Sequence, residues 1–257
     1  MTYEQILTER SGDFVTLTLN RPEQRNVLSL AMMGELIAAL EEIGQGDALG
    51  VTLAANGPVF CAGHDLRELS EAELSATRQL LSTCTMLVNT VQTIPQVVIA
   101  SVNGLATAAG CQLVATADLA VASTEARFAT PGGKGGWFCH TPLVAVGRNI
   151  GRKRALEMAL TGDDIDAATA LDWGLVNRVV PSAELPEATL DLLGRATRGS
   201  PENKAVGKRT LYAQLDMTQE RAYAHAVEVM AATSQTPDAR ERMNAFLEKR
   251  PPRFSGR

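Results

Sequence analysis

Residues 101–113 read SVNGLATAAGCQL, and the rest of the chain is arranged around this stretch. An apolar run over residues 97–102 predicts a buried strand, Asn103-Gly104 predicts a turn, and the small residues after it predict the start of a helix. The first N–H groups of a helix have no intrahelical partner and lie at the positive end of its dipole. Such a turn can bind a carbonyl oxygen that becomes negative during a reaction. Small residues also suit tight helix packing, so residues 101–113 alone leave both interpretations open.

The composition is that of an ordinary soluble globular protein, with 257 residues, of which 45% are hydrophobic and 21% charged. The net charge of −5 and the lack of a basic run argue against a nucleic-acid partner. Polar side chains interrupt the mildly apolar residues 97–122, so no membrane segment is expected. The N-terminal residues do not resemble a secretory signal, and the expected location is cytoplasmic.

The cysteines and histidines predict no metal site. The four cysteines are widely spaced and form no CxxC pair, which favours reduced thiols. The three histidines form no HExxH pair. Cys139 and His140 are adjacent, and neighbouring side chains usually point apart, so packing is favoured over a nucleophile pair. Asp65 and Asp118 are candidates for a general base, although a lone aspartate more often caps backbone N–H groups.

The order of predicted elements indicates an α/β protein. Strands are expected over residues 14–19, 50–55, 97–102, 119–122 and 176–180, and helices over 29–43, 74–94, 142–150, 153–160 and 166–172. This alternation favours a core of mostly parallel strands. From residue 182 the pattern is helical, with breaks at Pro201 and Pro237. We therefore expect a core over residues 1–195 and a helical region over residues 196–257.

Two small-residue turns have the same character. Ala62-Gly63-His64 and Ala108-Ala109-Gly110 each follow a buried run and precede a helical segment. If the two strands are parallel neighbours, both turns lie at one end of a sheet, where ligands of α/β folds bind. One N–H group from each turn would then form an oxyanion hole.

Short motifs along nearly the whole chain match one known family. They are NRP at 20–22, RNVL at 25–28, FCAGHDL at 60–66, the stretch from NG at 103–104 to GC at 110–111, ADL at 117–119, FATP at 128–131, residues 168–176, and AFLEKR at 245–250. On these motifs the chain resembles the enoyl-CoA hydratase/isomerase (crotonase) superfamily. The resemblance implies a crotonase-type ββα spiral over residues 1–195. It also implies that the helical region over 196–257 forms homotrimers, often paired into hexamers.

The resemblance further implies an acyl-CoA thioester as the substrate, with no other cofactor. The backbone N–H groups of His64 and Ala109 would form the oxyanion hole and stabilise a thioester enolate. The residues expected to line the substrate site are Arg25, Val27, Ala62, Asp65, Leu66, Gly110, Trp137 and Lys249. Arg25 and Val27 would lie at the CoA entrance, and Lys249 would reach the nucleotide end of CoA, in a neighbouring subunit.

The chain departs from the family's hydratase pattern at two positions. Hydratases of the family use two glutamates to hold a water and move its protons. At the matching positions this chain has Gln112 and Gly132. Gln112 can orient a water or the substrate but cannot accept a proton, and Gly132 supplies no side chain. His64, Asp65, His140 or a water are the remaining candidates for proton transfer.

Three functions remain open from the sequence. Overall similarity indicates a hydratase-type enzyme of fatty acid metabolism, acting as a lyase or an isomerase. Gly63-His64-Asp65 resembles the triplet of methylmalonyl-CoA decarboxylase relatives, whose reaction needs an oxyanion hole but no strong base. The third is a non-catalytic acyl-CoA-binding protein, with residues 137–140 as an apolar lid. An enzyme is favoured over a binding protein, although the fold alone does not identify the reaction.

Overall fold

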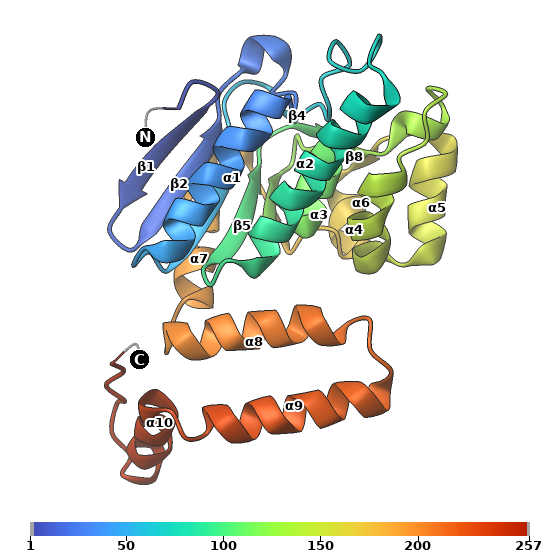
Figure 1. Cartoon of the computed structure of the whole chain (residues 1–257). Coiled ribbons are helices and arrows are strands. Elements are labelled where there is room, and N and C mark those ends of the chain that lie inside the picture. Colours follow the sequence, from blue (N-terminus) through green and yellow to red (C-terminus); the bar gives the residue numbers. More distant parts are fainter. Residues whose placement is uncertain (1–2, 256–257) are drawn as a thin grey trace.

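A computed structural model of the chain describes residues 3–255, and a twisted six-stranded sheet runs through the centre of this part (Figure 1). In spatial order its strands are β1 (Ile6–Ser11), β2 (Phe14–Leu19), β3 (Gly50–Ala55), β5 (Val97–Val102), β7 (Leu119–Ser123) and β10 (Arg178–Val180). The β1–β2 pair is antiparallel and the other pairs are parallel. The parallel strands are buried apolar runs, as expected for strands that are covered on both faces.

The structure contains a second sheet, which has four short strands. Its strands are β4 (Val59–Cys61), β6 (Leu105–Thr107), β8 (Arg127–Ala129) and β9 (Ile165–Asp166), in that spatial order. Each of β3, β5 and β7 is followed directly by β4, β6 or β8, and the first two such pairs are followed by a helix. This repeat is the ββα spiral, and the α/β fold class is confirmed.

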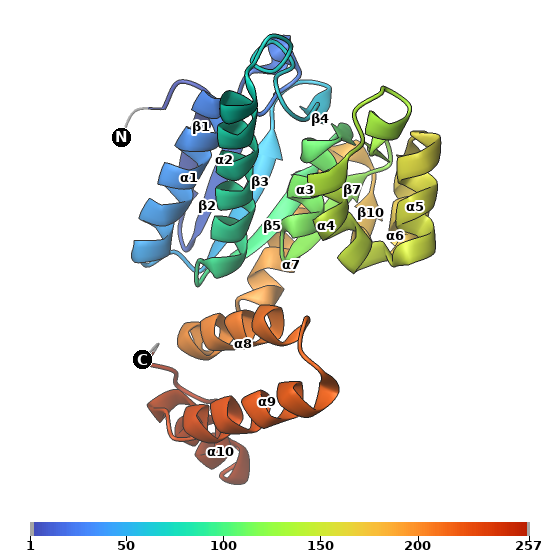
Figure 2. The ribbon, with the colours of Figure 1, turned by 45° about the vertical axis from the view of Figure 1, so that its right-hand side comes forward.

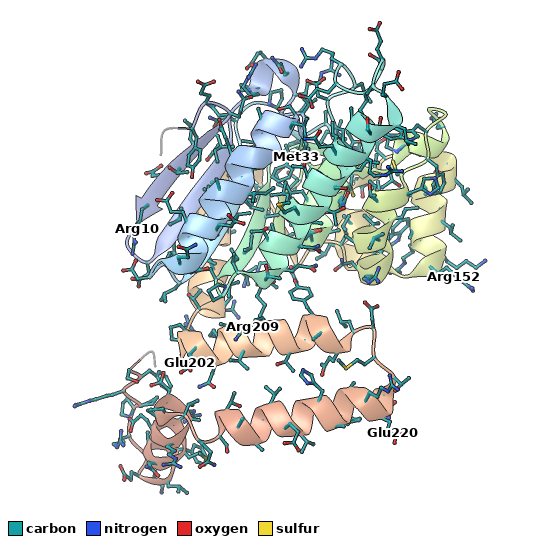
Figure 3. All side chains as sticks on the ribbon, viewed as in Figure 1. Arg10, Met33, Arg152, Glu202, Arg209 and Glu220 are labelled. Carbon is teal, nitrogen blue, oxygen red and sulfur yellow. The ribbon has the colours of Figure 1, made fainter. Side chains whose placement is uncertain are left out.

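Helices cover the sheets and bury most of the core. They are α1 (Leu30–Gln45), α2 (Leu74–Thr93), α3 (Ala109–Thr116), α4 (His140–Ile150), α5 (Arg152–Thr161) and α6 (Ala167–Trp173). Ser29 is the N-cap of α1, and its side chain accepts a hydrogen bond from Met32 N–H at 3.1 Å. Met33 on α1 is labelled in Figure 3, and its side chain is fully buried. Among the described residues, no helix combines the length and the apolar character needed to cross a membrane.

The C-terminal helices form a layer beyond one end of the sheets (Figures 1 and 2). α7 (Leu185–Ala196) packs on the core and leads to α8 (Pro201–Gln214), α9 (Gln219–Thr233) and α10 (Pro237–Leu247). The predicted breaks at Pro201 and Pro237 are the first residues of α8 and α10, where a missing N–H is tolerated. Lys208 on α8 donates hydrogen bonds to the carbonyl oxygens of Val91 on α2 and of Gln96, which precedes β5, and so links α8 to the core. The boundary at residue 195 and the trimeric assembly stay predictions.

The structure contains strands that the sequence did not predict, among them β6 and β1. The stretch after Asn103-Gly104 does not enter a helix at once, because residues 105–107 first form β6 and extend the second sheet. β1 was not expected, since only its first residue, Ile6, is buried and no alternation of apolar and polar residues marks it.

Candidate active site

The two small-residue turns meet in the structure. β4 and β6 are parallel neighbours, with Cys61 paired to Ala106, so the turn after each strand lies at the same end of the second sheet. A Cβ atom added to Gly63 would lie 2.9 Å from Ala108 Cβ and 3.2 Å from Ala109 N. The prediction that strand pairing brings the two turns together is confirmed. In Figure 2, β4 lies close to α3, the helix that begins at Ala109.

Both expected donors have a free N–H group. Within residues 3–255, neither His64 N–H nor Ala109 N–H donates a hydrogen bond to another residue. The carbonyl oxygen of Gly63 accepts a hydrogen bond from Leu28 N–H at 2.7 Å. Because carbonyl and N–H point in opposite directions across a trans peptide, this bond directs His64 N–H away from Leu28. Ala109 is the first residue of α3, so its N–H has no partner inside the helix.

The backbone before each donor has a positive φ angle. Gly63 has φ +86°, which glycine adopts without cost, and no Cβ fits there beside Ala108. Ala108 has φ +51° and ψ −119°, a conformation that costs a residue with a Cβ about 1–3 kcal/mol. Ala108 is held in it from both sides, since its N–H donates to Ala129 O at 2.9 Å and its carbonyl accepts from Gln112 N–H at 3.1 Å. Strain of this kind is often found where a backbone group is aimed at a ligand.

A cleft with a volume of about 730 Å³ opens beside the two turns. Ten of the expected site residues line it, namely Arg25, Val27, Ala62, His64, Asp65, Leu66, Ala109, Gly132, Trp137 and His140. Most of the lining comes from turns and helix ends, and it is largely apolar, as in sites for small organic ligands.

Three expected site residues are not among those that line the cleft. Gly110 is buried and allows α3 to approach β4, because a Cβ there would collide with the carbonyl group of Cys61. Gln112 is buried too, and its side-chain oxygen lies 4.0 Å from Cys84 Sγ, which donates to it. Lys249 is exposed and follows α10, so the structure of one chain places it away from the cleft. Its role beside CoA in a neighbouring subunit stays a prediction.

Gly132 lines the cleft, but its position has no room for a side chain. A Cβ atom there would collide with the carbonyl oxygen of Trp137 and lie 2.8 Å from Cys139 Sγ. The loop is closed by hydrogen bonds from Trp137 N–H to Gly132 O at 2.9 Å and from Gly132 N–H to Cys139 Sγ at 3.3 Å. The loop around residue 132 therefore excludes a carboxylate at this position in its present conformation.

Three ionisable groups of the lining, those of His64, Asp65 and Cys139, are either paired or favoured in the uncharged form. Arg67 holds Asp65 through contacts of 2.6 and 2.9 Å, and these hydrogen bonds keep the pKa of that carboxyl below its usual value. Asp65 also accepts from Arg67 N–H at 3.0 Å, so the capping interpretation of this aspartate is confirmed. Burial lowers the pKa of His64 and raises that of the Cys139 thiol, which favours the uncharged form of both.

Sequence reasoning missed part of the lining. The missed residues include Arg67, Leu81, Thr107, Thr141 and Pro142, whereas Phe138 and Cys139 belong to the segment that was expected as a lid. Arg67 follows Asp65 by two residues, a spacing that could have indicated the ion pair. Leu81 and Pro142 carry no local signal, because they reach the cleft only through the packing of α2 and α4. No group of three His, Cys, Asp or Glu side chains is placed to hold a metal ion among residues 3–255.

Comparisons with known proteins identify the family of the chain. A sequence model of the family "Enoyl-CoA hydratase/isomerase" matches residues 9–257. The chain is 42% identical over 251 residues to enoyl-CoA hydratase domain-containing protein 3, mitochondrial, of Danio rerio, covering 97% of this chain and 87% of the relative. It is 33% identical to 2,3-dehydroadipyl-CoA hydratase of Escherichia coli, covering 98% and 99%. The crystal structure of an enoyl-CoA hydratase from Mycobacterium smegmatis superposes with a TM-score of 0.95 at 43% identity, covering 98% of this chain and 99% of that one.

One expectation from the sequence is contradicted by these comparisons. The expected location was cytoplasmic, whereas the relatives from Danio rerio, Mus musculus and Homo sapiens have names that end in "mitochondrial". The expectation rested on the lack of a secretory pattern at the N-terminus and on the widely spaced cysteines, and neither feature distinguishes compartments inside a cell.

Proposed function

The chain belongs to the enoyl-CoA hydratase/isomerase family, and on this premise we propose that His64 N–H and Ala109 N–H bind the thioester oxygen of an acyl-CoA and stabilise its enolate. The observation that carries the proposal is the pair of free N–H groups on adjoining turns beside one cleft. When a bond to the carbon next to the thioester breaks, negative charge moves to the carbonyl oxygen. Preorganised N–H donors stabilise that charge, and each contributes about 3–4 kcal/mol in comparable sites.

The reaction we propose proceeds without a pair of carboxylates. Gln112 cannot take up a proton and does not line the cleft, and Gly132 has neither a side chain nor room for one. Asp65 is a weak base because Arg67 stabilises its ionised form. For proton transfer we propose His64, whose neutral form burial favours, or His140, both of which line the cleft. A lyase or isomerase step that forms the enolate through one of these groups, or through a water, fits this lining.

Decarboxylation of a malonyl-type thioester is the second candidate. Loss of carbon dioxide leaves its electron pair on the carbon next to the thioester, so the step needs an oxyanion hole but no base. The paired state of Asp65 favours this candidate over carboxylate-based hydration. We further propose that Arg25 and Val27 contact CoA at the mouth of the cleft and that no other cofactor takes part. The assembly we propose is a trimer or a pair of trimers.

The first experiment incubates the purified protein with a pool of short and long 2-enoyl-CoAs, 3-enoyl-CoAs and methylmalonyl-CoA, and follows it by mass spectrometry. Loss of 44 mass units (about one carbon dioxide) from methylmalonyl-CoA would identify the decarboxylase. A gain of water would identify a hydratase, and a shifted double bond, seen by chromatography, would identify an isomerase. Retention of one acyl-CoA without turnover would overturn the proposed enzymatic function and indicate a binding protein.

A further inference from the structure

The orientation of the His64 donor depends on a residue outside the cleft. We propose that Asn26 is a positioning residue that fixes the Gly63–His64 peptide through Leu28, so that His64 N–H is aimed at the thioester oxygen. The inference rests on the proposed function, because it assigns a task to Asn26 in the same oxyanion hole. Asn26 is not among the residues that line the cleft, and its side chain is fully buried.

The first step is the contact between Leu28 and the His64 turn. Leu28 N–H donates to Gly63 O at 2.7 Å, and Leu28 O accepts from Asp65 N–H at 3.4 Å, so the backbone of Leu28 brackets His64 on both sides. The Leu28 side chain is 1% exposed and packs in the core, which holds this segment in place. If Leu28 shifts, the Gly63–His64 peptide loses the partner that sets its rotation.

The second step is the anchoring of the segment by Asn26. Its Nδ2 donates to Asn56 O at 2.9 Å and to Val59 O at 2.8 Å, and its Oδ1 accepts from Arg21 N–H at 2.8 Å. Val59 is the first residue of β4, the strand that leads into the His64 turn. One side chain therefore ties the segment before Leu28 to the strand before His64.

The third step is the backbone that this anchor holds. Arg25 and Asn26 have φ angles of +54° and +51°, two successive residues in the left-handed region. Asparagine tolerates this region better than most residues, and arginine does not. Arg25 O accepts from Ala62 N–H at 3.0 Å, which adds a second link to the turn. The three buried hydrogen bonds of Asn26 stabilise a conformation that the backbone alone would not keep.

The test replaces Asn26 with glycine, which keeps the left-handed backbone and removes all three side-chain hydrogen bonds. Asn26→Asp is the second variant, because it keeps the acceptor for Arg21 N–H and removes only the two donors. Gln96→Ala is the matched control. Gln96 is also a buried amide that donates to a backbone carbonyl, that of Ile43 at 2.8 Å, and it is not among the lining residues.

The readout is the infrared carbonyl stretch of bound acetyl-CoA labelled with carbon-13 at the thioester carbon. In the wild type, hydrogen bonds from the hole move this band to lower frequency. We expect both Asn26 variants to lose most of the shift and the Gln96→Ala variant to keep it, at similar losses of melting temperature. Where turnover is found, kcat should fall about 10²-fold, with a smaller change in KM.

The outcomes separate the inference from the proposed function. A wild-type band without any shift would overturn the oxyanion hole itself. A shifted band that stays unchanged in both Asn26 variants would overturn the role of Asn26 and leave the hole intact. An equal loss of shift in Gln96→Ala would show a general effect of destabilisation and would also overturn the positioning role.

Discussion

Replacing Ala109 with proline removes one proposed donor of the oxyanion hole without removing a backbone hydrogen bond of the fold described for residues 3–255. Ala109 is the first residue of α3, where proline is well tolerated and where the N–H has no intrahelical partner. The nearby hydrogen bonds, from Ala108 N–H to Ala129 O and from Gln112 N–H to Ala108 O, do not use the Ala109 N–H. The new ring carbon would also occupy the space in front of the nitrogen, where the thioester oxygen is proposed to bind.

The expected effect follows from the loss of that single donor. Oxyanion-hole donors contribute about 2.7–4 kcal/mol, so kcat should fall about 10²–10³-fold. The assay is turnover of whichever acyl-CoA the pool experiment identifies, with thermal unfolding in parallel, because proline restricts Ala108, which already has a positive φ. Ala108→Gly is the control, since it relaxes that φ, keeps the Ala109 N–H and should retain most of the activity. Wild-type turnover in a folded Ala109→Pro variant would refute the assignment of this donor.

Three further predictions concern the same cleft. Gly63→Ala should lose activity and more than the ~1–2 kcal/mol of stability expected from its φ of +86°, because its Cβ would also lie 2.9 Å from Ala108 Cβ. Gly12→Ala, with φ +59° and no atom within 4 Å of its new Cβ, should lose about 1–2 kcal/mol and no activity. Urea unfolding and turnover distinguish the two variants, and equal activities would contradict the prediction. Gly132→Glu should destabilise the fold by about 1–3 kcal/mol through its collision with Trp137 and should not confer hydration of crotonyl-CoA; a stable variant that hydrates it would refute the packing argument. Burial lowers the pKa of His64, so the unfolded chain binds more protons than the folded chain once the pH falls below the ordinary pKa of about 6.5. The free energy of unfolding should therefore decline from pH 7 to 5, and less steeply in His64→Gln. An equal decline in both proteins, measured by urea unfolding, would contradict the assignment of this pH dependence to His64.

The strands with a clear pattern could be predicted from the sequence to the residue. β2, β3 and β5 have the expected bounds, because alternating or continuous apolar runs between turn residues leave few alternatives. β6 could not be found in this way, since three residues are too few to show a period and they form a strand by pairing with β4 and β8. β1 lacks a pattern because only one of its residues is buried.

The candidate site was predictable in part for a similar reason. The glycines and alanines of the two turns identify the donors, since close approach of a backbone to a ligand requires small residues wherever it occurs. The sequence left two roles for Asp65, a general base or a cap of backbone N–H groups. The structure shows its carboxylate paired with the Arg67 guanidinium. Gln112 was expected beside the substrate, but the packing of α3 places its side chain next to Cys84.

The sequence by itself determined the family, the two small-residue turns and the presence of Gln112 and Gly132, because these depend on which residues are present and in what order. The tertiary structure alone decided that Gly132 has no room for a side chain and that Leu28 N–H fixes the Gly63–His64 peptide. Leu28 and Gly63 are distant in the chain, and Gly132, Trp137 and Cys139 belong to one loop, yet each set comes within a few ångströms only in the folded protein. Steric exclusion and hydrogen bonding act over that range, so they take effect only after the sheets have formed.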